Sequence, residues 1–275
     1  MFNLQAEIES IYSNAAATVD ERVGRILADF RQGLNQGAIR AAEPNGQSWN
    51  ANVWVKKGLA LCARLGRLSQ AAPDSPIELD TLPQRTFTLE DRVRVADSTC
   101  FVRDGACISP GCTLMPHTVV QMGVYVGPNT VIDAGSSIGA CAQIGAGVHI
   151  NAGVQIHGQV QPLESLPVIV GDGASIGANS VIGTGAMIGA GAVVFPGMVL
   201  TSQSRLYDPI KKQRYTANAS APLIVPPFAI VMPGTRTIAG PEIMDLSLGV
   251  QIGIIAGYAN DPQLPAALLD RLLES

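Results

Sequence analysis

Charged and aromatic residues are scarce in this sequence: Asp, Glu, Lys and Arg make up 15% of its 275 residues, and Phe, Trp and Tyr make up 5%. The formal net charge is −4, whereas a general nucleic-acid surface is normally basic. The chain also lacks a run of about eighteen apolar residues and a basic-then-apolar leader. We therefore expect a cytoplasmic protein that binds neither nucleic acid nor a membrane.

Lysine and arginine are entirely absent from residues 104–204. The only acidic residues in that stretch are Asp104, Asp133, Glu164 and Asp172. An isolated carboxylate in a nearly neutral region is a candidate functional group, because such residues are costly to place without a purpose.

The five cysteines are odd in number and form no CxxC pair. They are Cys62, Cys100, Cys107, Cys112 and Cys141. A buried free thiol behaves as a small hydrophobic side chain, so we expect these cysteines to be structural and predict no metal site.

An aliphatic residue returns every six positions from Val102 onward. The first ten positions are Val102, Ile108, Leu114, Val120, Val126, Ile132, Ile138, Ile144, Ile150 and Ile156. After a pause at 162–167, the register resumes at Val170, Ile176, Ile182, Ile188, Val194, Leu200 and Leu206. Neither the helical period of 3.6 nor simple alternation gives a repeat of six. The period predicts a left-handed parallel β-helix, in which each hexapeptide forms one face of a coil.

The residues between the aliphatic positions suit tight corners. Pairs such as Pro128-Asn129, Ala134-Gly135 and Pro196-Gly197 recur there, and Gly, Asn and Pro tolerate or preset a bend. A generic Gly/Ala-rich tract would not keep one register over seventeen positions. The fold class is therefore mainly β.

Three regions are expected along the chain. Residues 1–101 form an N-terminal helical domain and a connector, with a first strand over 87–95. Residues 102–238 form the β-helix, with an excursion at 207–224. Residues 239–275 form a small C-terminal cap with a short helix over 264–272. Solenoids need such caps, since an open sheet edge invites pairing.

Helical spacing marks three helices within residues 1–70. Asp20 is placed to cap the second helix and Gly37 to end it, while Asn45-Gly46 marks a turn. The third helix carries Lys56 and Lys57, which we expect on a solvated face.

Seven strings in the helical region, the coils and the excursions are distinctive. They are residues 34–43 (LNQGAIRAAE), 54–57 (WVKK), 102–106 (VRDGA), 114–116 (LMP), 139–145 (GACAQIG), Pro162-Leu163 and 204–208 (SRLYD). These strings resemble the tetrahydrodipicolinate N-succinyltransferase family. The resemblance covers nearly the whole chain, and the helical-domain strings make it more specific than a hexapeptide repeat alone.

The resemblance implies a homotrimer with sites between subunits. Succinyl-CoA would lie along the β-helix, and the amino group of an acyclic 2-aminopimelate-type acceptor would attack its thioester. The family's site Asp matches Asp133. The family's site Glu is replaced by Val181, and the Arg two positions before that Glu by Asn179.

Other departures cluster around the acceptor site. Residues 157–162 read HGQVQP where the family has GGVLEP, and Gly135 replaces an aromatic residue. A paralogue with an altered acceptor fits this pattern, such as the tabtoxin-biosynthesis acyltransferase of the same family. That branch makes acetyl-CoA an alternative donor to succinyl-CoA.

Two residues are candidates for the chemistry. Asp133 follows the inward Ile132, so it faces outward, where it would orient or deprotonate the amine; the alternative is a turn-capping role. His157 is outward and replaces a family Gly, so it is the candidate for the missing carboxylate's part. His149 matches a family His, for which we expect structural use.

Binding residues are predicted for both substrates. The acceptor set, placed by family position, is Arg94, Arg103, Gly158, Asn179 and Ser180. The acyl-CoA set, in which cations would meet phosphates, is Gly197, Ser204, Arg205, Lys211, Lys212, Arg214 and Arg236. A basic surface loop serving solubility is the alternative for the second set.

Other functions remain open at this point. If replacement of the family's Glu by Val181 abolishes acyl transfer, the protein would be a non-catalytic trimer that binds CoA or another ligand. A nucleotidyltransferase is disfavoured because residues 1–101 are short and lack a Gly-rich nucleotide loop. A zinc site of three imidazoles is disfavoured because the three histidines show no ligand spacing.

Overall fold

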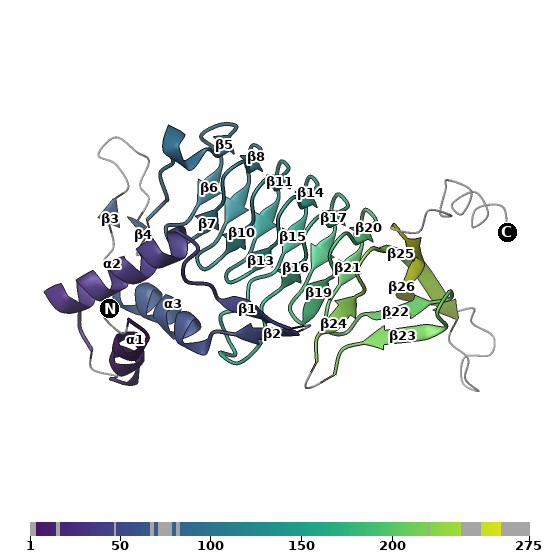
Figure 1. Cartoon of the computed structure of the whole chain (residues 1–275), viewed down its shortest axis with the longest axis horizontal. Helices are drawn as coiled ribbons and strands as arrows, with labels where there is room; N and C mark the ends of the chain where they lie inside the picture. Colours follow the sequence, from purple (N-terminus) through teal and green to yellow (C-terminus); the bar gives the residue numbers. More distant parts are fainter. Residues whose placement is uncertain are drawn as a thin grey trace.

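The protein is elongated, and a β-helix separates N-terminal helices from a C-terminal group of strands (Figure 1). The computed structural model describes residues 4–14, 17–46, 48–66, 69–70, 79–80, 83–218, 221–237 and 249–259. No helix within these ranges is long and apolar enough to cross a membrane. The predicted left-handed parallel β-helix of hexapeptide repeats, with an N-terminal helical region, is confirmed.

Each coil has three short strands, which stack into three faces. Face 1 contains β5 (Arg94–Val95), β8 (Thr113–Leu114), β11 (Val131–Ile132), β14 (His149–Ile150), β17 (Ser175–Ile176) and β20 (Val193–Val194). Face 2 contains β6 (Phe101–Val102), β9 (Val119–Val120), β12 (Ser137–Ile138), β15 (Gln155–Ile156), β18 (Val181–Ile182) and β21 (Val199–Leu200). Face 3 contains β7 (Cys107–Ile108), β10 (Tyr125–Val126), β13 (Gln143–Ile144), β16 (Ile169–Val170), β19 (Ala186–Ile188) and β24 (Leu223–Val225).

The six-residue period places the aliphatic side chains inside the coils. Ile132 pairs with Ile150, eighteen positions later, and both are completely buried. The residue before each of them, Val131 or His149, points outward because neighbouring side chains on a strand face opposite ways. At the corners, Gly135 adopts a φ of +70°, a conformation that glycine reaches without strain.

Two excursions interrupt the coils, and both leave the edge between faces 2 and 3. The first follows β15, so that Ile144 pairs with Val170, 26 rather than 18 positions later. The second follows β21, so that Ile188 pairs with Val225, 37 positions later. The predicted bounds of the second excursion need correction, because the chain leaves the coil after Leu200. Leu206 is buried, as its place in the repeat suggests, but it lies outside the coil.

Four strands extend face 1 into a ten-stranded sheet at the C-terminal end (Figure 1). They are β22 (Arg205–Asp208), β23 (Gln213–Thr216), β25 (Ala229–Thr237) and β26 (Gly249–Tyr258). The sheet order is β23-β22-β26-β25-β20, so β26 lies between the excursion hairpin and the last coil. The sequence did not predict β26, and the helix predicted over 264–272 lies outside the described residues.

The N-terminal region contains three helices: α1 (Leu4–Ser13), α2 (Glu21–Asn35) and α3 (Val53–Leu65). The predicted cap is confirmed, because the Asp20 carboxylate accepts a hydrogen bond from the backbone N–H of Val23 at 2.7 Å. Gly37 follows the end of α2 with a φ of +71°, as predicted.

Several N-terminal expectations are wrong in detail. Residues 42–51 are not helical but form an antiparallel hairpin of β1 (Ala42–Asn45) and β2 (Ser48–Ala51) around the predicted turn. A second antiparallel pair joins β3 (Ser69–Gln70) and β4 (Leu79–Asp80). Within 87–95, only Arg94–Val95 is a strand, because Leu89–Asp91 forms a 3-10 helix, η1.

The helices pack against the edge between faces 2 and 3. Phe30 of α2 is fully buried, and Gly58 of α3 leaves it room, since a Cβ there would lie 2.5 Å from the ring. Met122 and Cys141 reach from two coil corners into the same apolar cluster. The edge of the excursions is therefore also the edge that carries the N-terminal region.

Candidate functional site

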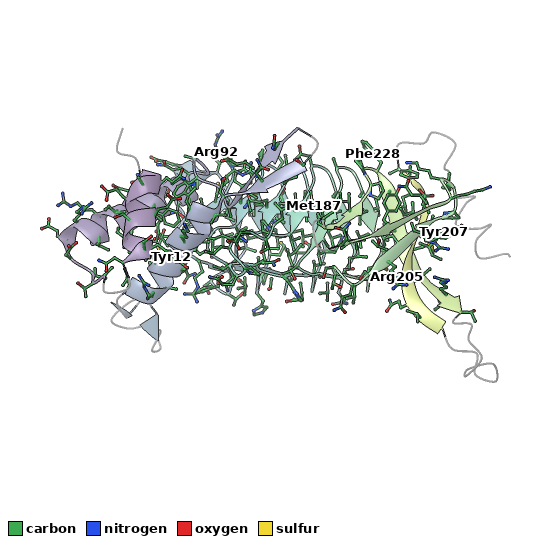
Figure 2. The ribbon with its side chains drawn as sticks, turned by 90° about the horizontal axis from the view of Figure 1, so that it is seen from below. Tyr12, Arg92, Met187, Arg205, Tyr207 and Phe228 are labelled. Carbon is green, nitrogen blue, oxygen red and sulfur yellow. The ribbon has the colours of Figure 1, made fainter. Side chains whose placement is uncertain are left out.

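An open cleft of about 1280 Å³ lies at the C-terminal end of the β-helix. It is lined by residues of β22, β23, β25 and β26 and by the corner that precedes β22. Figure 2 shows Arg205 and Tyr207 at this end, opposite the helices. A smaller hollow of about 190 Å³ adjoins the cleft and shares Gln203, Ser204 and Arg205 with it.

Strand register places three arginines on one face of the sheet that forms the cleft. Tyr207 pairs with Arg214 on β23 and with Ile254 on β26, and alternation puts Arg205 on the same face. Across β26, Val250 pairs with Arg236 of β25. Arg205, Arg214 and Arg236 therefore project from one surface, although they come from three different strands.

The middle of that surface is apolar. Val250, Ile252 and Ile254 alternate along β26, between Arg236 on one side and the two arginines of the hairpin on the other. Among the described residues, Arg205, Arg214 and Arg236 make no ion pair. The surface thus suits an elongated ligand that has both apolar and anionic groups.

The two lysines predicted for the same role lie elsewhere. Lys211 places its ammonium 3.8 Å from the ring centre of Tyr258, and Lys212 occupies the hairpin tip with a φ of +52°. Neither lines the cleft. Gly197 lies at a coil corner outside the lining, while Ser204 lines the cleft with a hydroxyl that bonds the backbone of Thr201 and Val199.

A buried carboxylate holds the hairpin to β26. Asp208 is fully buried and accepts hydrogen bonds from the backbone N–H groups of Ile210 and Lys211, both at 2.9 Å. It also accepts a hydrogen bond from the hydroxyl of Tyr258. Burial, followed by this hydrogen bond, raises the pKa of Tyr258 above its usual range. This pairing could not be predicted from local sequence, because it joins residues fifty positions apart.

Asp133 contacts His149, for which the sequence predicts a structural role. The Asp133 carboxylate lies 3.0 Å from Nε2 of His149 in the next coil, where face 1 meets the corner that leads to face 2. Both side chains remain accessible, with 32% and 49% of their surface exposed. Turn capping is the alternative expectation for Asp133, but its carboxylate contacts the ring of His149 rather than the backbone of its own corner.

His157 lies apart from this pair. It is exposed and follows β15, at the corner between faces 2 and 3 where the first excursion begins. The structure therefore does not bring His157 and Asp133 together at one corner of the chain. Gly158 packs closely against the preceding coil, since a Cβ at this position would lie 2.4 Å from the backbone N of Ala140.

Lys56 anchors the first excursion, and its predicted solvated position is wrong. The side chain is fully buried, and its ammonium donates to the carbonyl oxygens of Pro162 (3.3 Å) and Ser165 (2.5 Å) and to the Ser165 hydroxyl (3.2 Å). Burial lowers the pKa of Lys56 from its ordinary value. An N-terminal helix thus fixes the loop that carries His157.

The remaining acceptor residues are spread over the coils. Arg94 is exposed on face 1 near the first coil, and the guanidinium of Arg103 stacks on Phe101 with a centroid distance of 4.9 Å. Asn179 occupies a corner with a φ of +57°. Ser180 is completely buried and bonds the backbone of Phe195 and Met198, so its side chain is not available to a surface ligand.

All five cysteines are free and buried. Burial raises the pKa of the Cys62 thiol to about 11 and that of Cys141 to about 12. Within the described ranges, no group of three His, Cys, Asp or Glu residues is arranged to hold a metal ion.

Comparison with known proteins agrees with this architecture. Residues 3–65 match the family model described as "Tetrahydrodipicolinate N-succinyltransferase N-terminal". A 2,3,4,5-tetrahydropyridine-2,6-dicarboxylate N-succinyltransferase of Methylorubrum populi is 32% identical over 243 residues, which are 85% of this chain and 84% of the relative. The enzyme of the same name from Chelativorans sp. is 30% identical over 254 residues, 87% of each chain.

Among solved structures, a Campylobacter jejuni protein described as a 2,3,4,5-tetrahydropyridine-2-carboxylate N-succinyltransferase is 18% identical. The match covers 83% of this chain and 62% of that chain, with a TM-score of 0.48. These two sequence relatives cover 85% and 87% of this chain. The chain therefore belongs to the tetrahydrodipicolinate N-succinyltransferase family of acyltransferases.

Proposed function

We propose that this protein transfers an acyl group from acyl-CoA to the amino group of an amino-dicarboxylate or a related intermediate of lysine and diaminopimelate metabolism. The observation that carries the proposal is the cleft, in which Arg205, Arg214 and Arg236 surround an apolar strip. Family membership makes the chain an acyltransferase, and the cleft offers a place for the donor.

The cleft matches the chemistry of coenzyme A. The donor carries a diphosphate and a further phosphate, and arginine binds such groups through paired, charge-assisted hydrogen bonds. Ile252 and Ile254 offer apolar surface to the less polar parts of the molecule. Of the cations predicted to bind the acyl-CoA, this assignment retains Arg205, Arg214 and Arg236. It assigns no direct contact with the donor to Lys211 or Lys212.

The acceptor site differs from that of the succinyltransferases. Val181 replaces the carboxylate that the family carries and projects from face 2, half-buried, next to the outward residue Gln155. A carboxylate would bind an ammonium or polar group, whereas a valine would not. The acceptor therefore differs from the usual one, as in a paralogue resembling the tabtoxin-biosynthesis acyltransferase, and acetyl-CoA is a donor alongside succinyl-CoA.

Face 2 supports a homotrimer with sites between subunits. Its outward residues include Val119, Val181 and Val199, and Val199 is 48% exposed in the single chain. An apolar face on a rod-shaped subunit favours side-by-side association around a symmetry axis. Three rods packed in this way would bring the Asp133 corner of one subunit close to a neighbour.

The test is a panel of donors and acceptors with the purified protein. Succinyl-CoA or acetyl-CoA is offered with L-2-aminopimelate and related amines, and thiol release and product mass are measured together. Turnover of other amines, with weak or no use of aminopimelate, is the expected result. Efficient succinylation of aminopimelate would show that Val181 is tolerated and would contradict the altered acceptor.

The second candidate is a trimer that binds CoA without catalysis, and the absence of a carboxylate at Val181 favours it. CoA binding by calorimetry with no thiol release across the panel would support this alternative. The same result would contradict acyl transfer.

A further inference from the structure

We propose that His149 is the proton acceptor of the transfer reaction and that Asp133 is its positioning residue. The inference rests on the proposed function and reverses the expected roles, in which Asp133 acts on the amine directly. The observation is the 3.0 Å contact between Nε2 of His149 and Oδ2 of Asp133 on the outside of a coil.

The geometry of the pair defines which nitrogen is the base. An ionised carboxylate can only accept hydrogen bonds, so a neutral His149 carries its proton on Nε2, and this N–H donates a hydrogen bond to Asp133. The lone pair then lies on Nδ1, on a ring that is 49% exposed. A carboxylate that orients an imidazole in this way fixes the tautomer that is useful for general-base catalysis.

The pair lies on the same sheet surface as the donor cleft. His149 points outward from β14, and the register continues through Ser175, Val193 and Ile230 on β25. Alternation along β25 carries that surface to Arg236. Three strand spacings, or about 14 Å, separate β14 from Ile230 of β25, and Arg236 lies six residues, or about 20 Å, farther along β25. The donor would therefore have to lie extended along this surface, with its phosphates at the cleft and its thioester at His149.

Few charged groups surround the pair. The outward neighbours of His149 on β11 and β17 are Val131 and Ser175, and Val193 follows on β20. In the other direction along face 1, the outward residue of β8 is Thr113. The next outward residue is Arg94 of β5, which lies three strands from His149. Within the described residues, the carboxyl group in contact with the ring is therefore that of Asp133.

The chemical step balances with these groups alone. The neutral amine nitrogen attacks the thioester carbonyl carbon and forms the C–N bond, while Nδ1 of His149 accepts the proton from that nitrogen. The C–S bond then breaks, and the imidazolium returns the proton to the departing thiolate. The products are the amide and free CoA, and the histidine is regenerated. Asp133 stabilises the imidazolium without changing its own protonation.

The first test compares matched histidine variants of the full-length protein. His149→Asn is expected to lower kcat/KM by roughly 100-fold or more while CoA binding is kept, because a positioned base contributes about that much. Its rate should also lose the decline toward acid pH that imidazole protonation imposes. His117→Asn is the control, since His117 is an exposed corner residue for which Asn tolerates the same positive φ.

Asp133→Asn is expected to lower kcat/KM while the acid decline persists, because the base remains but loses its orientation. If His149→Asn retains turnover within a few-fold and an unchanged pH profile, the proposal is overturned. Absence of turnover by the unmodified protein would overturn this proposal and the proposed function together. A loss of CoA binding or folding in both His149→Asn and His149→Gln would also count against it.

The second test needs no turnover. With three histidines in the chain, ¹⁵N labelling gives few imidazole signals, and His149→Asn assigns one of them. The Nε2–H tautomer is expected for His149, and Asp133→Asn should abolish that preference while the other two rings are unaffected. A neutral His149 ring with its proton on Nδ1 would contradict the proposal.

Discussion

The regular coils and the irregular ends of this molecule are stabilised in different ways. Inside the coils, stacked aliphatic residues such as Ile132 and Ile150 are completely buried, and side-chain charges are nearly absent. At the ends, buried polar groups hold the structure, as when Asp208 binds Tyr258 or Lys56 binds the first excursion. The coils act as a scaffold, and the candidate chemistry lies where the repeat is interrupted or carries an unusual side chain.

The difference shows what a repeat can and cannot provide. A hexapeptide period fixes which side chains point inward, so every coil is stabilised by the same packing. It leaves the outward positions free to vary, whereas the corners with a positive φ favour glycine or asparagine, as at Gly135 and Asn179. The two excursions and the N-terminal helices all use the edge between faces 2 and 3, whereas the Asp133–His149 pair uses the corner between faces 1 and 2.

Removing a buried aliphatic residue from a coil is expected to have the largest effect on stability. Ile138→Ala leaves a cavity in a column of fully buried side chains, so the free energy of unfolding should fall by about 2–5 kcal/mol. The adjacent outward residue provides the control, since Ser137→Ala should change it by no more than about 0.5 kcal/mol. Urea denaturation measures both, and similar effects would contradict the inward–outward division of the coil.

Removing a cleft arginine is expected to reduce donor binding while stability is kept. Arg236→Ala should cost about 1.5–3 kcal/mol of CoA binding free energy, the usual range for a hydrogen bond to a charged group. Isothermal titration calorimetry measures the change. Arg25→Ala, on the surface of α2 beside Glu21, removes the same charge far from the cleft and should leave affinity unchanged. Equal losses in both variants would show only a general charge effect.

Replacing the buried lysine tests a polar anchor in the same way. Lys56→Met should lower the free energy of unfolding by about 1–3 kcal/mol, because the oxygens of Pro162 and Ser165 lose their donor. Lys57→Met is the matched control, since Lys57 lies on the same helix with its ammonium 5.7 Å from the ring centre of Tyr12. Thermal and urea denaturation distinguish the two variants.

The same lysine gives the anchor a pH dependence. Because burial lowers the pKa of Lys56 in the folded protein, the unfolded chain binds more protons between that value and 10.5. Stability contributed through this group therefore rises as the pH increases through that window. The difference in unfolding free energy between the native protein and Lys56→Met should follow this trend, and a difference that falls over the same range would contradict it.

The smallest expected effect is that of thiol reagents on the native protein. All five cysteines are buried, and the raised pKa values of Cys62 and Cys141 keep the reactive thiolate rare. Ellman's reagent should therefore release little colour until the protein is denatured, when five thiols become reactive. Rapid labelling of the folded protein would show that the coils open readily.

Much of the fold could be predicted because its signals are local. The six-residue register fixed the coils from Val102 to Leu200, and Asp20 marked the start of α2 by its own chemistry. The β26 strand could not be predicted, because its pairing with β22 and β25 depends on contacts between distant segments. Leu206 continues the six-residue register in the sequence but lies in β22, outside the coils. A buried aliphatic residue suits either a coil strand or β22, so the pattern could not distinguish them.

The candidate site was predictable only in part. The sequence identified Arg205, Arg214 and Arg236 by charge, but it also included Lys211, whose ammonium the fold directs to Tyr258. Asp133 was recognised as an outward carboxylate. Its contact with His149 could have been found from the repeat, since the two residues lie sixteen positions apart, close to one full coil of eighteen. Lys56 gave no such signal, because a lysine on a helix is usually exposed.

The neutral stretch of coils also determines how the protein can be cut. Trypsin cleaves after lysine and arginine, and residues 104–204 contain neither, so the cleavable bonds lie toward the two ends of the molecule. Digestion would therefore remove the helices and the C-terminal strands piece by piece while leaving one long fragment that ends at Arg205. In a peptide-mapping experiment, the scaffold of this enzyme would be present as a single large peptide and would be missed by methods tuned to short ones.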